Sequence, residues 1–311
     1  MNQCNNPDIN DIKTIKNTLL ALYSLLYAIS VLSVFIIYQI SKFPTTKWTP
    51  ARKWFATIKT KSIEIIPAHQ HIENSMDSLI IAPKFVNWLN KFNPQQIQLN
   101  SVTITDINWF STKPEPNKLG FVKCSVDAID VSTNKKIVSN IAFIRGNSVA
   151  ILIIVKIANL VTRRSKSISS EKETEYVLLC EQMRLPVGER KREICAGMTD
   201  AEGNIASVVL KEVKEETGLV IKHVSELVSL GSIYPSPGGC DEEIHLYSWS
   251  TMISQAEFNE KQTKVFGNPD EYEEIKLSFV EINEFMTTTL KEIGDVKAEC
   301  ALFRHLLNDK K

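Results

Sequence analysis

The stretch that decides the fold is GMTDAEGNIASVVLKEVKEETGL, residues 197 to 219. The run from Ile205 to Thr217 contains neither proline nor glycine. Asn204 is a candidate N-cap, and Gly218 stands where a helix C-terminus favours a left-handed residue. Apolar residues recur in the run at helical spacing, at Ile205, Val208, Val209 and Val213. The stretch therefore predicts a glycine turn and an amphipathic helix whose apolar face packs on a sheet.

The polar side of this helix is acidic. Glu212 and Glu216 are four residues apart and share one stripe of the helix, with Glu215 about 60° to the side. Three carboxylates within one turn repel each other unless a cation neutralises them. Hard oxygen ligands at this density suit Mg²⁺ or Mn²⁺ better than zinc. Spacing alone also allows a solvated acidic helix face, so a metal site and an ordinary surface both stay open.

The same stretch resembles the Nudix box, the glycine–loop–helix–glycine signature of enzymes that hydrolyse nucleoside diphosphates linked to another group. The matching positions are Gly197, Glu212, Glu215, Glu216, Gly218 and Leu219. Two positions depart from the pattern, because Gly203 replaces a loop glutamate and Lys211 replaces an arginine. The resemblance implies a metal held by the three glutamates and by the main-chain carbonyl of Ala196. It also implies catalytic roles for Glu215 and Glu216.

Four further segments resemble the ADP-sugar diphosphatase branch of that family, and its plant members most of all. They are IRGNSVAIL (144–152), LLCEQMRLPVG (178–188), AGMTD (196–200) and YPSPGGCDEEIHLY (234–247). The resemblance covers roughly residues 79 to 307. It implies an α/β fold, a Nudix α/β/α sandwich with a mixed sheet. Alternating strand-like and helix-like segments after residue 141 favour the same α/β class.

The resemblance also implies roles for residues outside the box. Arg184, on a Glu-Gln-x-Arg strand, is expected to bind phosphate, together with Arg145, for which a structural ion pair is the alternative. Glu193 is expected to orient substrate or metal. The rigid Pro-Ser-Pro-Gly-Gly turn is expected to shape the sugar end of the pocket through Ser236, Gly238 and Asp241.

The expected general base lies in the acidic loop NPDEYEEIK, residues 268 to 276. Carboxylates that bind metal are poor proton acceptors, so the base must come from elsewhere. Glu271 and Glu273 are favoured over Asp270 and Glu274. A solvated acidic loop is the alternative for any single member.

The implied reaction is Mg²⁺-dependent hydrolysis of nucleotide-sugars such as ADP-glucose or ADP-ribose to a nucleoside monophosphate and a sugar phosphate. A UDP-sugar is an alternative substrate within the same class. Gly203 and Lys211 motivate a different class, a catalytically weak module that binds a nucleotide-sugar at a membrane. Members of the branch are commonly dimers, so a homodimer is expected.

Near the start of the chain, residues 18 to 40 read TLLALYSLLYAISVLSVFIIYQI without a charge. That length spans a bilayer, and a signal peptide usually has a shorter apolar region. Lysine and arginine dominate residues 42 to 61, which places the rest of the chain on the cytoplasmic side. The stretch predicts a single-pass anchor, with a cleaved or organelle-targeting peptide as the alternative.

Composition agrees with a globular cytoplasmic part. The 36 basic and 36 acidic residues balance, so nothing favours nucleic-acid binding. Six scattered cysteines without a C-x-x-C pair indicate reduced thiols, and neither a disulfide framework nor a zinc site. The predicted organisation is a tail (1–17), the anchor (18–40), a linker (41–75), a β-rich subdomain (76–140) and the Nudix domain (141–311).

Overall fold

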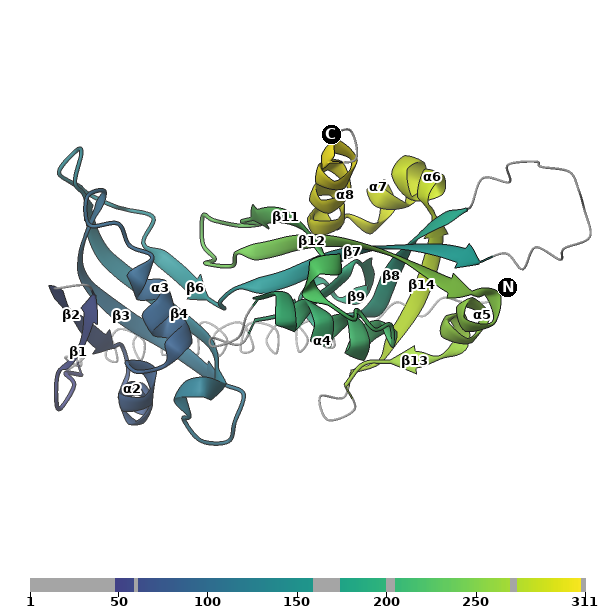
Figure 1. The fold of residues 1–311 in the computed structure, drawn as a ribbon. Helices are drawn as coiled ribbons and strands as arrows, with labels where there is room; N and C mark the ends of the chain where they lie inside the picture. Colours follow the sequence, from purple (N-terminus) through teal and green to yellow (C-terminus); the bar gives the residue numbers. More distant parts are fainter. Residues whose placement is uncertain (1–47, 59–60, 159–173, 200–204, 269–272, 309–311) are drawn as a thin grey trace, which may run out of the picture. The chain divides into compact units, whose positions relative to one another are not determined.

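Two β-sheets form the framework of the part of the chain that the computed structural model describes, and Figure 1 shows them as ribbons. The described residues are 48–58, 61–158, 174–199, 205–268 and 273–308. Residues 50–311 belong to one unit of the chain. No described helix is long and apolar enough to cross a membrane. The predicted anchor, residues 18 to 40, lies outside the described residues.

The first sheet has the order β1-β2-β3-β4-β5, with β6 also paired to β4. Strands β2 and β3 are parallel, and the other pairs are antiparallel. The elements of this part are β1 (Trp54–Ile58), β2 (Lys61–Pro67), η1 (Gln70–Ile72), α2 (Glu73–Leu79), α3 (Pro83–Asn90), β3 (Ile97–Trp109), η2 (Pro116–Lys118), β4 (Leu119–Asp130), β5 (Lys135–Lys136) and β6 (Ile141–Ile144).

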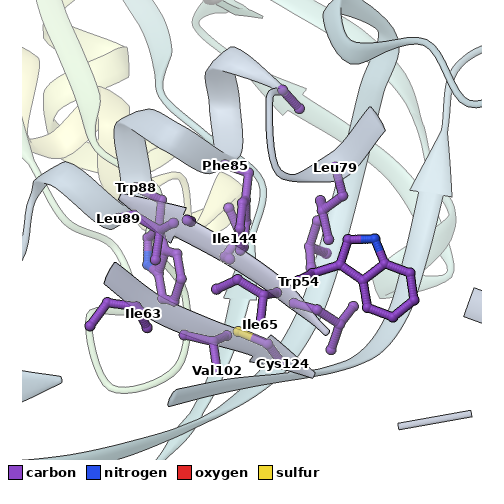
Figure 2. Close-up of a cluster of buried hydrophobic side chains, with 14 of the residues drawn as sticks. Trp54, Ile63, Ile65, Leu79, Phe85, Trp88, Leu89, Val102, Cys124 and Ile144 are labelled. Atoms are coloured by element: carbon purple, nitrogen blue, oxygen red, sulfur yellow. The ribbon is translucent and has the colours of Figure 1, made fainter. Parts of the chain in front are cut away.

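One apolar core joins this sheet to its helices. Alternate residues of β2, Ile63 and Ile65, point into it from the strand, as the two-residue period of a strand requires. Phe85 and Leu89 reach it from α3, one helical turn apart, and Figure 2 shows these side chains converging. Burying one such side chain contributes about 1.5–3 kcal/mol.

The predicted linker, residues 41 to 75, is wrong over much of its length. Strands β1 and β2, the turn η1 and the start of α2 lie within it. Prolines suggested a linker, but Pro67 is the last residue of β2, where a missing N–H is tolerated. The predicted boundary after residue 140 also differs, because β6 pairs with β4 of the first sheet.

The second sheet has the order β11-β12-β7-β8-β14-β13, with β10 paired to β7 and β9 paired to β8. Strands β7 and β12 are parallel and the other neighbours are antiparallel, so the mixed sheet and the α/β class are confirmed. Its strands are β7 (Ser148–Ala158), β8 (Glu175–Arg184), β9 (Glu189–Glu193), β10 (Cys195–Met198), β11 (Val228–Ile233), β12 (Ile244–Ser254), β13 (Val265–Phe266) and β14 (Ile275–Glu281).

The helical elements of this part lie between and after the strands. They are η3 (Leu185–Val187), α4 (Ile205–Thr217), η4 (Val224–Glu226), α5 (Gln255–Thr263), α6 (Ile282–Glu284), the π-helical turn η6 (Phe285–Thr289), α7 (Leu290–Ile293) and α8 (Val296–Asn308). The helix predicted over residues 205 to 217 is therefore confirmed as α4.

Strand β7 is buried on both faces. Ile151 and Ile153 belong to the core that contains Val209 and Val213 of α4. The intervening residues Ala150, Leu152 and Ile154 belong to a second core with Ala298, Ala301 and Leu302 of α8. Helices α4 and α8 thus cover opposite faces of the sheet, as Figure 1 shows, which is the α/β/α arrangement expected.

Helix α4 ends at a glycine with a cation beside it. Gly218 has φ of +65°, a left-handed conformation that costs a side-chain-bearing residue free energy. The buried Lys261 donates from Nζ to the carbonyl oxygen of Thr217 at 2.9 Å. A positive charge at a helix C-terminus complements the helix dipole. The acidic end of α4 is therefore held in place by both local backbone geometry and a distant residue.

Candidate active site

Glu216, in the last turn of α4, is the most buried carboxylate of the predicted metal set, with 2% of its surface exposed. Its Oε2 accepts a hydrogen bond from the backbone N–H of Ala196 in β10 at 3.2 Å. Burial, together with the charges of Glu212 and Glu273, raises the pKa of Glu216 to about 7. Glu212 and Glu273 therefore lie close enough to Glu216 to disfavour its charged form.

Gly197 brings β10 into close approach with α4. A Cβ atom added at Gly197 would lie 2.1 Å from Cδ of Glu212, so no larger residue fits here without moving that carboxylate. The box glycine and the first box glutamate are therefore in direct contact. Glu212, Glu216 and the backbone of Ala196 converge at this point, as oxygen ligands of a hard cation would. This donor set fits Mg²⁺ or Mn²⁺ on its chemistry.

The close approach predicts that Gly197→Ala displaces the Glu212 carboxylate and lowers hydrolysis about 100-fold, the order of loss that a 1 Å misplacement causes. Steady-state kinetics beside circular dichroism would measure this. Gly188→Ala is the control for an added methyl group without a clash, because a Cβ at Gly188 meets no atom within 4 Å; its φ of +74° adds backbone strain away from the box glutamates, which circular dichroism monitors. Equal activity of the two variants would contradict the proposed role of the contact.

Glu215 is placed differently from its two neighbours. Its side chain is 36% exposed and lies 3.6 Å from the Nζ of Lys211, one turn earlier on α4. The backbone N–H of Gly267 donates to the carbonyl oxygen of Glu215. Glu215 is thus at the rim of the cluster. Lys211 reaches the same carboxylate through an (i, i+4) ion pair.

Of the two favoured candidates for the base, only Glu273 is described. Its charge raises the pKa of Glu216, which places the two carboxylates in one electrostatic cluster. In the amide orientation that satisfies both of its groups, the buried Gln182 donates to Oε1 of Glu273 at 3.3 Å and accepts from Nη2 of Arg184 at 3.1 Å. Glu271 lies outside the described residues, as do Asp270 and Gly203.

Arg184 and Glu193 form a two-pronged ion pair between β8 and β9. Nε of Arg184 donates to one Glu193 oxygen at 2.8 Å, and Nη2 donates to the other at 3.1 Å. Lys297 of α8 donates to Glu193 at 3.1 Å and to Asp295 at 2.8 Å. Burial acts to raise the pKa of Glu193, but Arg184 and Lys297 outweigh it and lower the pKa.

Sequence reasoning missed Gln182, Asp295 and Lys297 in this network. Asp295 is 5% exposed, and its Oδ2 accepts the backbone N–H of Ile194 at 3.1 Å. Ile194 directly precedes β10 and Asp295 directly precedes α8, so this hydrogen bond ties the start of α8 to the strand that approaches Glu216. Gln182 lies in the Glu-Gln-x-Arg strand, two residues before Arg184, and that position was the available signal in the sequence. Nothing local in the sequence links Asp295 or Lys297 to a segment about one hundred residues earlier.

Arg145 and Asp241 meet, but through the backbone. Oδ1 of Asp241 accepts the N–H groups of Arg145 and Gly146 at 2.7 Å and 3.1 Å. The guanidinium of Arg145 lies 3.4 Å from Glu242, which also accepts from Ser148 at 2.9 Å. The structure thus shows the ion pair that was the alternative for Arg145, and Asp241 closes the turn between β6 and β7.

The Pro-Ser-Pro-Gly-Gly turn lines a cavity of about 450 Å³ together with α3 and the first sheet. The carbonyl of Ser236 accepts from the N–H groups of Gly239 and Cys240, which makes the turn compact. The aromatic side chains in the cavity wall are Trp88, Phe92 and Tyr234. Gly238 and Asp241 also line the cavity. The structure therefore places Gly238 and Asp241 at one cavity, on a different segment from the glutamates.

A chain of hydrogen bonds connects that cavity to the box. Lys91 of the cavity wall donates to the side chain of Asn147 at 3.1 Å and to the carbonyl of Asp241 at 3.4 Å. The carbonyl of Asn147 accepts from both the N–H and the hydroxyl of Thr199 at 3.0 Å. Thr199 lies two residues after Gly197, so one residue, Asn147, touches both regions.

The second part of the chain is similar to known proteins. A family model described as "NUDIX domain" matches residues 161–299. "Nudix hydrolase 14, chloroplastic" of Arabidopsis thaliana is 30% identical over 222 residues, which are 66% of this chain and 65% of the relative. An "ADP-ribose pyrophosphatase" of Haemophilus influenzae is 30% identical over 124 residues, 37% of this chain and 53% of the relative.

The chain thus spans about two thirds of the length of the plant relative and about half of the bacterial one. Among solved structures, a crystal structure described as an "ADP compounds hydrolase" covers 68% of this chain and 96% of its own, at 15% identity and a TM-score of 0.42. That structural likeness is too weak to support an argument about function.

Proposed function

The chain belongs to the Nudix hydrolase family, and from this membership we propose that it hydrolyses the diphosphate bond of nucleotide-sugars of the ADP-glucose or ADP-ribose type. The products are a nucleoside monophosphate and a sugar phosphate. The observation that carries the proposal is the convergence of Glu212, Glu216 and the Gly197 backbone at one point. The plant relative is named a Nudix hydrolase, and the bacterial relative is named an ADP-ribose pyrophosphatase.

Glu212, Glu215, Glu216 and the carbonyl of Ala196 are the groups proposed to hold Mg²⁺ or Mn²⁺. When bound, such an ion neutralises phosphate charge and lowers the pKa of a water molecule. The burial of Glu216 makes its charged form costly without a cation, which favours ion binding at this position. Glu215, whose side chain is 36% exposed, lies at the rim of the set, where substrate and solvent can reach it.

Glu273 is the proposed general base. Its carboxylate belongs to the same electrostatic cluster as Glu216 but comes from the segment before β14 and not from α4. Gln182 holds it through the side-chain amide at 3.3 Å. A base that is oriented by a neutral partner keeps its capacity to accept a proton from water. Glu271 stays a proposed base on sequence grounds alone.

Arg184 is proposed to contact a phosphate oxygen. Glu193 engages its Nε and Nη2 atoms, which fixes the plane of the guanidinium. A guanidinium held in this way presents its remaining Nη1 donor in one direction, and so less conformational entropy is lost on binding an anion. Glu193 accordingly acts as the positioning residue for Arg184, and this is how it is proposed to orient substrate.

The test is hydrolysis by a variant that lacks residues 1–45, with ADP-glucose, ADP-ribose and UDP-glucose offered in separate reactions with Mg²⁺. The described unit begins at residue 50, so this truncation leaves both sheets intact. Turnover of an ADP-sugar that is lost in Glu216→Gln supports the proposal. Turnover of UDP-glucose alone makes a UDP-sugar the substrate. Tight ADP-ribose binding without turnover favours the nucleotide-sugar binding module instead.

The cavity beside the 234–241 turn is the proposed site for the sugar or nucleoside end of the substrate. Its aromatic wall suits the apolar face of a base or sugar, and Asn147 connects it to the box. We expect Tyr234→Ala to raise KM roughly 10-fold, equivalent to about 1.4 kcal/mol of binding free energy, with kcat little changed. Phe110→Ala, an exposed aromatic outside the cavity wall, is the control. An unchanged KM would remove the cavity from the substrate site.

We further propose that residues 18–40 anchor the protein in a membrane as a single span with the Nudix domain on the cytoplasmic side. The uncharged sequence and the basic flank that follows it support this. Full-length protein is expected in the membrane pellet after alkaline carbonate extraction, and the variant without residues 1–45 in the supernatant. Recovery of a shortened, soluble chain from cells expressing the full sequence would show a cleaved targeting peptide. Homodimer formation is a separate proposal, tested by sedimentation of the truncated variant.

A further inference from the structure

Two cysteine thiols lie against the carboxylate of Glu216, and no motif in the sequence predicts this grouping. The ligand atoms of Cys180, Cys195 and Glu216 all lie within 4.8 Å of one another. The exposed fractions of the three residues are 1%, 0% and 2%. Sequence spacing disfavoured a zinc site because no C-x-x-C pair is present, but the fold brings these thiols together from separate strands.

The elements that carry the three residues are rigid. Cys180 lies in β8, Cys195 begins β10, and both side chains belong to the core under α4, together with Val209 and Val213. Glu216 is fixed from the other side by the N–H of Ala196. Ligands on packed strands and a helix keep their spacing better than ligands on loops.

From this geometry we propose that Cys180, Cys195 and Glu216 form a binding site for a thiol-seeking divalent cation of the Zn²⁺ class, distinct in chemistry from the Mg²⁺ site but sharing Glu216 with it. Ligands of one tetrahedral zinc lie about 3.5–4 Å apart, given bond lengths of about 2.0–2.3 Å. Closing the cluster from within 4.8 Å therefore needs side-chain shifts of about 1 Å or less. Thiolate sulfur binds Zn²⁺ much more strongly than Mg²⁺, so the two cysteines make this site selective for Zn²⁺.

Without a metal, the two thiols and Glu216 form hydrogen bonds with one another, and a bound cation must replace these hydrogen bonds. Hydrogen bonding connects the Cys195 thiol to Cys180 and to Glu216. A divalent cation binds both sulfurs as thiolates, and its charge favours that form. Coordination releases the thiol protons to solvent and replaces the hydrogen bonds with metal–ligand bonds. Soft divalent cations form such bonds to buried sulfur, whereas hard cations do not.

Occupation of this site inhibits hydrolysis, and this part of the inference rests on the proposed function. Two divalent cations on the one Glu216 carboxylate repel each other, and Zn²⁺ held by the two sulfurs draws that carboxylate away from the Mg²⁺ position, so the two ions compete. The binding part of the inference does not depend on any activity. A direct measurement of coordination therefore separates failure of the site from failure of the proposed reaction.

The experiment uses Cd²⁺ as a spectroscopic substitute for Zn²⁺, in full-length protein in which Cys4 and the partly exposed Cys240 and Cys300 are replaced by serine. Cys124 is kept, because it is buried in the first sheet. We expect one equivalent of Cd²⁺ to produce the ultraviolet charge-transfer band of a metal–thiolate bond. Cys180→Ala and Cys195→Ala should each raise the Kd for Cd²⁺ more than about 10-fold, because even a partner one shell beyond the metal is worth roughly 10–100-fold.

X-ray absorption of the Zn²⁺ complex of the same background decides the question even if an alanine variant fails to fold. Two sulfur neighbours with oxygen or nitrogen completing the shell support the site, and Zn²⁺ inhibition that added Mg²⁺ relieves supports its regulatory role. A Zn²⁺ complex without sulfur neighbours, or a thiolate band that survives in the Cys180→Ala/Cys195→Ala double variant, overturns the proposal. A protein with two bound sulfurs but no hydrolysis of any nucleotide-sugar retains the site and loses only the proposed function.

Discussion

Glu216→Gln is expected to abolish hydrolysis while making the metal-free protein more stable. Loss of a direct metal ligand should lower kcat/KM at least about 100-fold, since even indirect metal partners are worth roughly 10–100-fold. In the opposite direction, the substitution removes a carboxylate whose burial raises its pKa from 4.5 to about 7. Each pKa unit corresponds to about 1.4 kcal/mol, so the variant should gain about 3 kcal/mol above pH 7.

The sign of the pH dependence follows from proton binding. Between pH 4.5 and about 7 the folded wild type holds a proton on Glu216 that the unfolded chain releases, so wild-type stability falls as pH rises through this window. Glu216→Gln lacks this pH-dependent contribution to the free energy of unfolding. Its extra stability over the wild type should therefore vanish near pH 4. Urea titrations in EDTA across this range measure it.

Glu215→Gln is the matched control for stability, because its side chain is 36% exposed. It should follow the wild-type pH dependence. Added Mg²⁺ should stabilise wild type by mass action and leave Glu216→Gln nearly unchanged. If Glu216→Gln destabilises the protein at every pH, Glu216 has a structural role that the burial argument misses.

Asp295→Ala is expected to cause the largest loss of stability, about 3 kcal/mol. The substitution leaves the N–H of Ile194 without its acceptor and removes one of the two carboxylates that hold Lys297. Burial alone would lower the pKa of Lys297, but Asp295 and Glu193 outweigh it and raise the pKa. Removing one partner of a buried pair is costly because the remaining charge stays desolvated.

Two further substitutions separate these contributions. Asp295→Asn keeps an oxygen for Ile194 and loses the charge, so about half of the loss is expected. Lys297→Met in the Asp295→Ala background should recover part of the stability, because the uncompensated charge is gone. Denaturant unfolding of wild type, Asp295→Ala, Lys297→Met and the double variant gives the coupling free energy. Additive effects of Asp295→Ala and Lys297→Met would show that the two side chains do not interact.

The sequence predicted correctly those secondary-structure elements that are determined by residues within the element itself. Helix α4 has the predicted bounds because apolar spacing and Gly218 act within the segment itself. The linker prediction failed for the opposite reason. Strands β1 and β2 are short, and each gains its partners only by pairing within the first sheet, which proline content near residues 44 to 67 obscured.

The site divides in the same way. The motif placed Gly197 and Glu212 in one turn–helix segment, and the structure brings these two residues into contact. The partners of Glu193, by contrast, come from β8 and α8, and the neighbours of Glu216 include thiols from two strands. Such pairings depend on which strands are adjacent, and one sequence read in order does not reveal adjacency.

The pairing of β7 with β12 has a consequence for how the protein is made. Ser148 through Ala158 pair with Ile244 through Ser254, so one long edge of β7 has no partner until β12 is synthesised. A nascent chain that has left the ribosome only as far as α4 already contains every glutamate of the box. It also exposes an apolar strand with unpaired N–H and C=O groups, the kind of surface that adds strands from other chains. During translation this protein should therefore depend on a chaperone that covers β7 until residue 254 has emerged.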